Sequence, residues 1–412
     1  MFMDIQIHNS FASSKRRVPN TSTAAAPCPV ELLSFMLGLD GMSGQGAAIP
    51  ARRVTLARFV QDVATAWDLR VTIDPSSALG DKAVIDVPST GEAGTTLLLV
   101  GYVGTAGTRM IERRHDGDDC RDYEVGCGGS SAKAAAAAML AAVCRYARID
   151  ERPNRVVLLL VMDAEAGAEA ITNLVTWDLD VAAIVPTWAI IGKPTGLMFA
   201  SIHGGSIRFR VHCSRDSNRN GTSAINALAG IASQLEREYL PKIAGRWHPL
   251  VGTASCMVTI ITSGTGSNAI ALEPELVVDR RILPFEDHDT VRAEFEAEIT
   301  KLTGALCIGV AIATQVVTGF PPVIPGAASL NPGTSTGAIS DTIRDLCSER
   351  YLSEAGSLGS LGIPTVLLGP GSIGPAHMIE NSIQPDQVIR AADLYLAAMQ
   401  TMFDYEPSAF CD

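Results

Sequence analysis

Three long apolar runs constrain the fold of this 412-residue chain more than any other feature. They read TLLLVGYV (96–103), RVVLLLVM (155–162) and AAIVPTWAII (182–191). Runs of this kind, without polar alternation, are typical of strands that are buried on both faces of a parallel sheet. None of them reaches the roughly 18 apolar residues that a membrane span needs. The sequence therefore predicts an α/β fold with a largely parallel sheet and no membrane partner.

Helical patterns alternate with these strands. They occupy residues 30–37, 51–67, 133–147, 337–352 and 385–403. The segment KAAAAAMLAAVCRYA (133–147) has strong helix propensity, and its alanines offer a small-residue face for close packing on a sheet. The alternation of strand and helix predicts βαβ units.

The pattern changes near residue 200, where strands become half-exposed. The strand segments 207–213, 255–262, 275–285 and 305–317 alternate with helices at 223–240 and 290–304, the latter with Asp287 or Asp289 as its cap. The order strand-helix-strand-strand-helix-strand is that of a ferredoxin-like unit. We therefore predict a tail at 1–28, a discontinuous α/β domain at 29–201 and 317–412, and an inserted α+β domain at 202–316.

Bulk composition excludes several classes of partner. A formal charge of −12 leaves no basic face for nucleic acid or anionic lipid. The first 27 residues lack the apolar region of a secretory signal. Nine scattered cysteines without a Cys-x-x-Cys pair indicate reduced thiols, so we expect a cytoplasmic protein.

Five segments contain the candidate site. They are TLLLVGYVGT (96–105), GCGGSSAKAAAAAML (126–140), LLLVMDAEAG (158–167), IIGKPTGL (190–197) and GPGSIGPAHMIEN (369–381). Together they resemble the dizinc amidohydrolase and exopeptidase family that includes acetylornithine deacetylase, succinyl-diaminopimelate desuccinylase and aminoacylase. The resemblance implies a zinc-binding α/β domain and an inserted ferredoxin-like dimerisation (lid) domain, hence a homodimer.

The resemblance also assigns a zinc-ligand position to each segment. In this chain those positions are occupied by Tyr102, Ser131, Glu165, Lys193 and His377, while Ala164 stands where the family has its catalytic base. A hydrolytic zinc ion needs three or four deprotonated ligands and an open site for water. Only Glu165 and His377 are of that kind, and Lys193 brings a positive charge. We therefore predict a degenerate zinc site, no bound metal and no other cofactor.

Two interpretations of the replacements remain open. In the first, Lys193, Tyr102 and Ser131 donate hydrogen bonds to a substrate carbonyl, with Glu165 or His377 as the acid or base. A lysine of lowered pKa could instead form a Schiff base. In the second, Lys193 only neutralises the leftover Glu165 in a dead site.

The other end of the family's substrate site is partly retained. Asn268 and Arg281 match positions at which the family holds the substrate carboxylate, and an arginine fork suits that task. The prediction is a metal-independent enzyme of a specialised biosynthetic pathway. It would act on a small amino-acid-like carboxylate or N-acyl/amide substrate by ligation, cyclisation, elimination or acyl transfer. The alternatives are a non-catalytic ligand-binding or regulatory homologue, and a residual amidohydrolase with a single metal.

Overall fold

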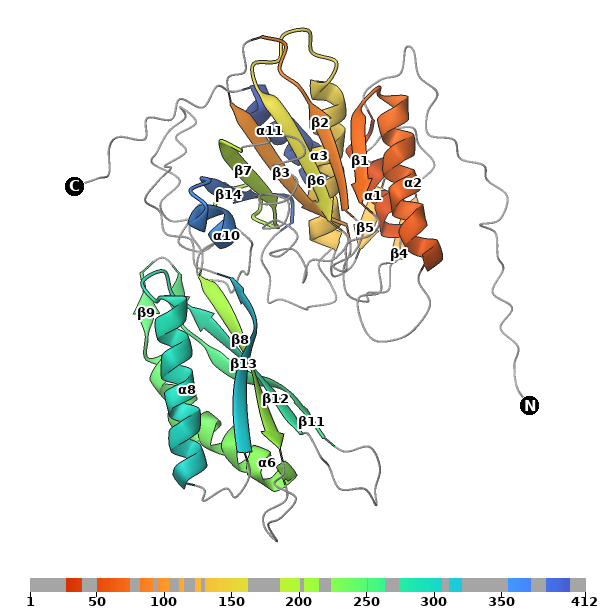
Figure 1. The fold of residues 1–412 in the computed structure, drawn as a ribbon. Coiled ribbons are helices and arrows are strands. Elements are labelled where there is room, and N and C mark those ends of the chain that lie inside the picture. Colours follow the sequence, from red (N-terminus) through yellow and green to blue (C-terminus); the bar gives the residue numbers. More distant parts are fainter. Residues whose placement is uncertain are drawn as a thin grey trace, which may run out of the picture.

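The computed structural model contains two large β-sheets that belong to separate parts of the molecule, and two small two-stranded ones (Figure 1). The structure describes residues 27–38, 50–74, 82–91, 95–103, 111–114, 123–126, 130–161, 186–200, 204–214, 224–249, 251–263, 274–305, 311–320, 355–371 and 383–400. The predicted helix at 337–352 lies outside these ranges. Among the described residues, no helix is both long and apolar enough to cross a membrane.

The first sheet has six strands in the order β1-β2-β6-β3-β7-β14. Its strands are β1 (Arg70–Asp74), β2 (Lys82–Val87), β3 (Thr96–Tyr102), β6 (Arg155–Val161), β7 (Trp188–Gly192) and β14 (Thr365–Leu368). The four strands β6, β3, β7 and β14 are mutually parallel, and β2 runs antiparallel to its neighbours. Two apolar runs form β3 and β6, and the end of the third run, from Trp188, forms β7, so the predicted α/β fold with a largely parallel sheet is confirmed.

Helices cover this sheet on one face. They are α1 (Pro29–Gly38), α3 (Ser130–Tyr146) and α11 (Pro385–Gln400), while α2 (Pro50–Ala66) packs beside β1 and β2. Leu97 and Leu99 of β3 point into the core beneath these helices, whereas Leu98 and Val100 point to the opposite face. That opposite face is covered in part by the short helix α10 (Ala355–Ser360). A separate ribbon consists of β4 (Ile111–Arg114) and β5 (Tyr123–Gly126).

Close packing of α3 on the sheet depends on glycine. A Cβ on Gly101 would lie 3.0 Å from Ala136, and a Cβ on Gly192 would lie 2.8 Å from the Cβ of Ala135. Both distances are shorter than ordinary van der Waals contacts, so a side chain at either glycine would push the helix away. The alanine run therefore does what the sequence predicted, since its small residues let α3 approach the ends of β3 and β7.

The second sheet is antiparallel, with the strand order β11-β12-β8-β13. Its elements follow one another as β8 (Gly205–Ser214), α6 (Ala224–Gln234), a π-helical turn η3 (Leu235–Tyr239), α7 (Leu240–Ala244), β11 (Cys256–Thr262), β12 (Glu275–Ile282), α8 (His288–Ala305) and β13 (Ala311–Phe320). This is the predicted ferredoxin-like order. The domain boundaries given above stay predictions.

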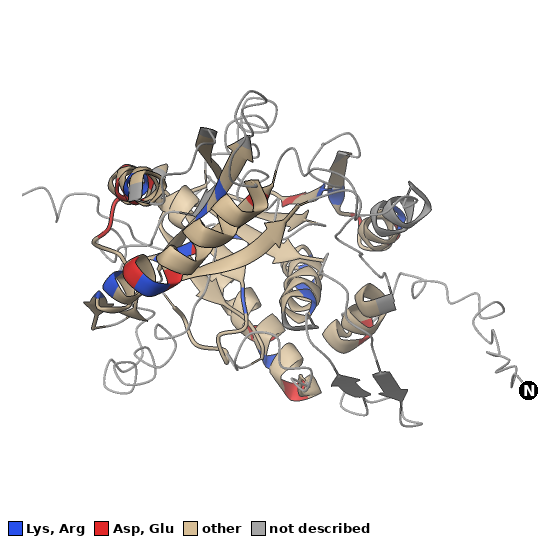
Figure 2. Ribbon diagram, turned by 90° about the horizontal axis from the view of Figure 1, so that it is seen from below, with Lys and Arg blue, Asp and Glu red and all other residues tan. Residues whose placement is uncertain are grey.

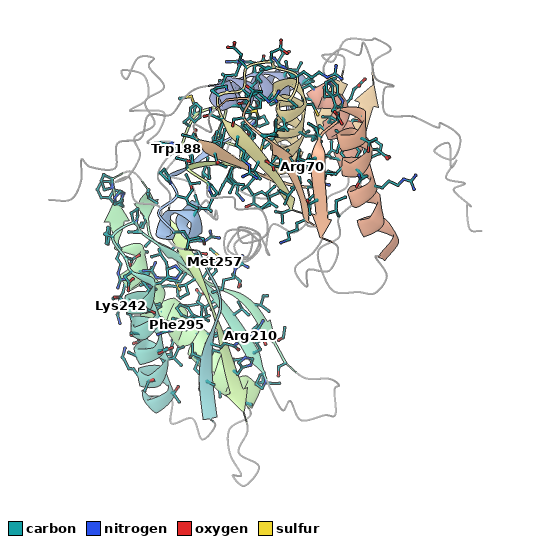
Figure 3. All side chains as sticks on the ribbon, turned by 45° about the horizontal axis from the view of Figure 1, so that its top comes forward. Arg70, Trp188, Arg210, Lys242, Met257 and Phe295 are labelled. Carbon is teal, nitrogen blue, oxygen red and sulfur yellow. The ribbon has the colours of Figure 1, made fainter. Side chains whose placement is uncertain are left out.

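One face of the second sheet packs against its helices. Phe209 of β8 stacks on Phe295 of α8 with ring centroids 4.0 Å apart, and Phe295 lies between helix and sheet in Figure 3. Asp287 caps α8, because its carboxylate accepts a hydrogen bond from the Thr290 N–H at 3.0 Å. Along α8, and along η3 and α7, both basic and acidic residues occur (Figure 2).

Two features of this domain were not predicted. The helix expected at 223–240 contains the π-helical turn, and Pro241, which has no N–H to donate to the preceding turn, is the second residue after it. A short hairpin formed by β9 (Trp247–His248) and β10 (Gly252–Thr253) connects α7 to β11. Two-residue strands are too short to show a period in the sequence.

The cysteines correct one expectation. Cys144, Cys213 and Cys256 are free and buried, but Cys28, immediately before α1, is disulfide-bonded to a partner outside the described residues. The prediction of reduced thiols is therefore wrong for Cys28. Sequence spacing does not reveal such a bond, because it requires only that the fold bring two Cα atoms within about 4.4–6.8 Å.

Candidate functional site

Lys193 and Tyr102 meet at the carboxyl edge of the parallel sheet. Tyr102 ends β3, and Lys193 directly follows β7, the parallel neighbour of β3. The Lys193 ammonium Nζ lies 4.2 Å from the centroid of the Tyr102 ring. Tyr102 is fully buried and Lys193 is half-buried. At this distance the ring quadrupole attracts the cation, so the contact holds a positive charge at the end of the sheet.

The backbone around Lys193 is fixed by the end of β14. The Lys193 N–H donates to the Leu368 carbonyl oxygen at 3.3 Å, and the Thr195 N–H donates to the Gly369 oxygen at 3.2 Å. In return, the Gly369 N–H donates to Thr195 Oγ1 at 3.1 Å. A Cβ on Gly369 would collide with the Lys193 carbonyl oxygen. These contacts leave the Lys193 backbone little freedom, so the point from which its side chain extends is fixed.

The other predicted residues of this end are only partly described. Ser131 belongs to the first turn of α3, which packs on β3 and β7, but its side chain lies outside the described residues, as do Glu165 and His377. Lys133, two residues further along α3, is 4% exposed. The structure therefore brings together Lys193 and Tyr102 and places the start of α3 near the same edge.

These residues do not suit a dizinc centre. Lys193 and Tyr102 occupy two positions that are zinc ligands in the family, and here the Lys193 ammonium packs on the buried Tyr102 ring. An ammonium group repels a zinc ion and does not ligate it. Within the described ranges, no three His, Cys, Asp or Glu side chains form a group that could hold a metal ion. Asp163, Glu165 and His377 lie outside these ranges. These residues therefore support no catalytic step that uses zinc.

Arg281 occupies a paired position on the inserted sheet. Its Nε lies 2.7 Å from Asp279 Oδ1, while Arg208 Nε on the adjacent strand β8 lies 3.4 Å from Oδ2 of the same carboxylate. One carboxylate thus orients two guanidinium groups. Asn268, the predicted companion of Arg281, lies outside the described residues.

Ser206 adds a polar group that sequence reasoning missed. It is the direct cross-strand neighbour of Arg281, and its side chain is fully buried. Its hydroxyl Oγ has no hydrogen-bond partner among the residues that the structure describes. Burying a hydroxyl without a partner is unfavourable, so Oγ is a candidate donor to a ligand beside Arg281. The alternation in SIRFRVHC would have placed Ser206, Arg208, Arg210 and His212 on one face.

The described free cysteines are unsuited to nucleophilic chemistry. Burial raises the pKa of the Cys144 and Cys256 thiols to about 12, and it also raises the pKa of Cys213. At neutral pH these thiols are protonated, and only the thiolate is a strong nucleophile. The chemistry of the site therefore has to come from other groups.

Comparison with known proteins identifies the second domain. Residues 201–306 match the family described as the peptidase dimerisation domain of the M20 peptidases. The inserted domain is therefore similar to peptidase dimerisation domains. Across 342 residues the chain is 25% identical to the N-formyl-4-amino-5-aminomethyl-2-methylpyrimidine deformylase of Bacillus subtilis. The alignment covers 73% of this chain and 78% of the deformylase.

Solved structures with the same fold include M20 metallopeptidases. Human carnosine dipeptidase 1 superposes with a TM-score of 0.65 at 12% identity, covering 91% of this chain and 96% of the dipeptidase. An M20 family metallo-carboxypeptidase from Sulfolobus solfataricus has a TM-score of 0.62 at 15% identity, with coverage of 90% and 98%. The predicted resemblance to the M20-type amidohydrolases and exopeptidases is therefore confirmed. At these identities the structural likeness establishes the fold alone.

Proposed function

We propose that this chain is a metal-independent enzyme on the M20 amidohydrolase scaffold. Its substrate would be a small amino-acid-like carboxylate or an N-acyl or amide compound, and the reaction a ligation, cyclisation, elimination or acyl transfer in a specialised biosynthetic pathway. The observation that carries the proposal is the Lys193 ammonium 4.2 Å above the Tyr102 ring, where the scaffold would otherwise present metal ligands. A cation held there can stabilise developing negative charge on a carbonyl oxygen.

The proposed roles follow from the chemistry of each group. Lys193 donates to the substrate carbonyl oxygen, assisted by the hydroxyl groups of Tyr102 and Ser131. Glu165 or His377 transfers the proton. In this proposal no metal is needed to polarise the carbonyl group, because the ammonium supplies the positive charge.

The opposite end of the substrate would be held by the inserted sheet. Arg281 is oriented by Asp279, and the buried Ser206 hydroxyl lies on the neighbouring strand. A guanidinium and a hydroxyl together suit a carboxylate, which accepts several hydrogen bonds. Asn268 would complete this group. The Bacillus subtilis relative is named as a deformylase, and this is consistent with an N-acyl substrate.

We also infer that the protein is a homodimer and cytoplasmic, with two copies joined through the inserted domain. The dimerisation-domain match supports the homodimer and does not bear on the location. Strand β11 is an outer strand of its sheet, and its side chains Met257, Ile260 and Ile261 are 41%, 49% and 51% exposed. An exposed apolar edge strand is a ready template for pairing with another chain.

A non-catalytic, ligand-binding homologue is the second candidate. The complete burial of Tyr102 favours this candidate. The Lys193 ammonium packed on a buried ring could serve only to neutralise the negative charge of a former metal site that no longer functions. In that case ligand binding at Arg281 would persist without turnover. The residual single-metal hydrolase remains the third candidate, with Glu165 and His377 as its ligands.

The three candidates differ in their response to chelation. A panel of N-acyl amino acids would be incubated with the protein, alone and with a small amine as acyl acceptor, and the products followed by mass spectrometry. The proposal predicts the same turnover before and after removal of metal ions by a chelator. Turnover that is lost on chelation and restored by zinc would contradict it. Binding without any product would favour the non-catalytic homologue.

A further inference from the structure

The turn that follows Lys193 is folded around one carbonyl group at the end of β14, the strand beside β7 (Figure 1). The Thr195 and Leu197 N–H groups donate to the Gly369 oxygen at 3.2 and 3.0 Å. The Thr195 hydroxyl lies 3.5 Å from the same oxygen, and it accepts a hydrogen bond from the Gly369 N–H at 3.1 Å. Hydrogen bonds in both directions therefore join the turn to the end of the strand.

The same turn contains a strained residue. Leu197 has a φ of +67°, which is unfavourable for a residue with a Cβ. Gly196 before it has a φ of +61°, which glycine adopts without that cost. The Leu197 side chain packs against the core of the α/β domain, and this contact helps to keep the backbone in the strained conformation. Strain that the surrounding structure maintains is concentrated at functional sites.

Helix α11 holds the end of β14 from the other side. The Tyr395 hydroxyl donates to the Leu368 carbonyl oxygen at 2.6 Å, and the Lys193 N–H donates to the same oxygen at 3.3 Å. Burial raises the pKa of the Tyr395 phenol, so its hydroxyl stays protonated and remains a donor. Gln387 of α11 accepts a hydrogen bond from the Gly371 N–H at 2.8 Å. The helix thus fixes the carbonyl group on which the Lys193 backbone depends.

Thr195 has a direct mechanical connection to Lys193. Pro194 lies between them, and its ring restricts its φ, so a displacement at Thr195 is passed on and not absorbed. The Thr195 side chain is fully buried. Without its hydroxyl, the buried Gly369 N–H would lose its acceptor, which is unfavourable unless the turn moves.

We propose that Thr195 is a positioning residue for Lys193 and that Tyr395 supports it from α11. Both act through the end of β14 and fix the point from which the Lys193 ammonium reaches the Tyr102 ring, 4.2 Å away. A group that stabilises developing charge works only when it is held close to its productive position. The use of Lys193 in catalysis rests on the proposed function, whereas the positioning is a property of the folded chain.

Nuclear magnetic resonance of lysine side chains tests the positioning without any substrate. The full-length protein would be labelled with 13C-lysine, and the lysines of the chain stand at positions 15, 82, 133, 193, 242 and 301. Because the Lys193 ammonium lies over the Tyr102 ring, the ring current should shift its neighbouring methylene protons upfield. Lys193→Arg removes this signal and so assigns it, and Tyr102→Leu should return it to the position of an exposed lysine.

Matched variants then separate the Thr195 hydroxyl from the packing of its side chain. Thr195→Val keeps the shape and removes the hydroxyl, so it should lose most of the upfield shift, whereas Thr195→Ser should retain it. Tyr395→Phe should reduce the shift. Thr365→Val is the control, because Thr365 is also buried on β14 and its hydroxyl donates to the Ile363 oxygen at 2.9 Å. This control should leave the Lys193 signal unchanged.

Kinetics add a second measurement on any substrate that the N-acyl panel identifies. Thr195→Val should lower kcat about 10- to 100-fold, as expected when a catalytic group is displaced by a fraction of an ångström to an ångström. The KM should change little, because the proposed carboxylate-binding group lies on the inserted sheet. Thr195→Ser should restore most of the activity.

The outcomes separate the positioning from the catalytic proposal. A Lys193 signal that is not shifted in the wild-type protein, or that keeps its shift in folded Thr195→Val, would overturn the positioning. So would an equal loss of the shift in Thr365→Val. If Thr195→Val does not fold, an unchanged shift in Tyr395→Phe would overturn it instead. A shift that follows the Thr195 hydroxyl in a protein without turnover supports the positioning and counts against the catalytic proposal alone.

Discussion

Replacing Lys193 by alanine is expected to lower kcat/KM by about 100- to 1000-fold, the range found when one donor to a developing oxyanion is removed. The reason is that the Lys193 ammonium, held 4.2 Å above the Tyr102 ring, supplies the positive charge that the scaffold would otherwise obtain from metal. Steady-state kinetics on the substrate identified from the N-acyl panel would measure the loss. Since Lys193 is half-buried and lies just after the end of β7, the fold should survive, and circular dichroism would verify this.

Companion variants distinguish charge from shape. Lys193→Arg keeps the positive charge but replaces a compact ammonium with a planar fork, so it should recover little activity. Tyr102→Phe retains the ring beneath the cation and removes only the hydroxyl donor, so its loss should be smaller than that of Tyr102→Leu. Wild-type activity in Lys193→Ala would remove Lys193 from the mechanism and favour one of the other two candidates.

Glu286→Ala is expected to produce the largest loss of stability, about 3–5 kcal/mol, which is typical of breaking a buried ion pair on one side. Glu286 accepts from both Arg280 and Arg246 at 2.6 Å, and the Arg280 guanidinium is fully buried. Removing the carboxylate leaves that charge inside the domain without its compensating anion. Urea unfolding followed by circular dichroism would report the loss in the transition of the inserted domain.

A surface ion pair in the same domain provides the control. Lys301 Nζ lies 3.0 Å from Glu238, but both side chains are about half exposed. Solvent screens such pairs, so Glu238→Ala should shift the unfolding midpoint little. If Glu286→Ala and Glu238→Ala behaved alike, the buried ion-pair network of Glu286 would not be what joins the hairpin to the loop before α8.

The sequence was sufficient to predict the parallel sheet and the inserted unit. The runs that became β3 and β6 are almost wholly apolar, and burial on two faces suits them in a parallel sheet. Alternation likewise marked β8, whereas β12, which was expected to be half-exposed, has five consecutive buried residues. The β9–β10 hairpin was missed because two-residue strands have no measurable period. The π-helical turn was missed because helical periodicity does not distinguish it from an α-helix.

The candidate site was harder to predict because it depends on contacts between distant segments. Motif positions placed Tyr102 and Lys193 at strand ends, and the structure adds that the ammonium packs on the ring. Arg208 and Ser206 escaped notice because their relation to Arg281 is set by the register of β8 against β12. The predicted roles of Ser131, Glu165, His377 and Asn268 stay predictions, since their side chains lie outside the described residues.

The most direct test of the central claim is the zinc content of the purified protein. Elemental analysis would be performed after expression in zinc-supplemented medium and again after equilibrium dialysis against zinc. With only Glu165 and His377 as remaining ligands and Lys193 among them, the account predicts zinc well below one equivalent per chain in both samples. One or two tightly held equivalents, lost on substitution of Glu165 or His377, would contradict it.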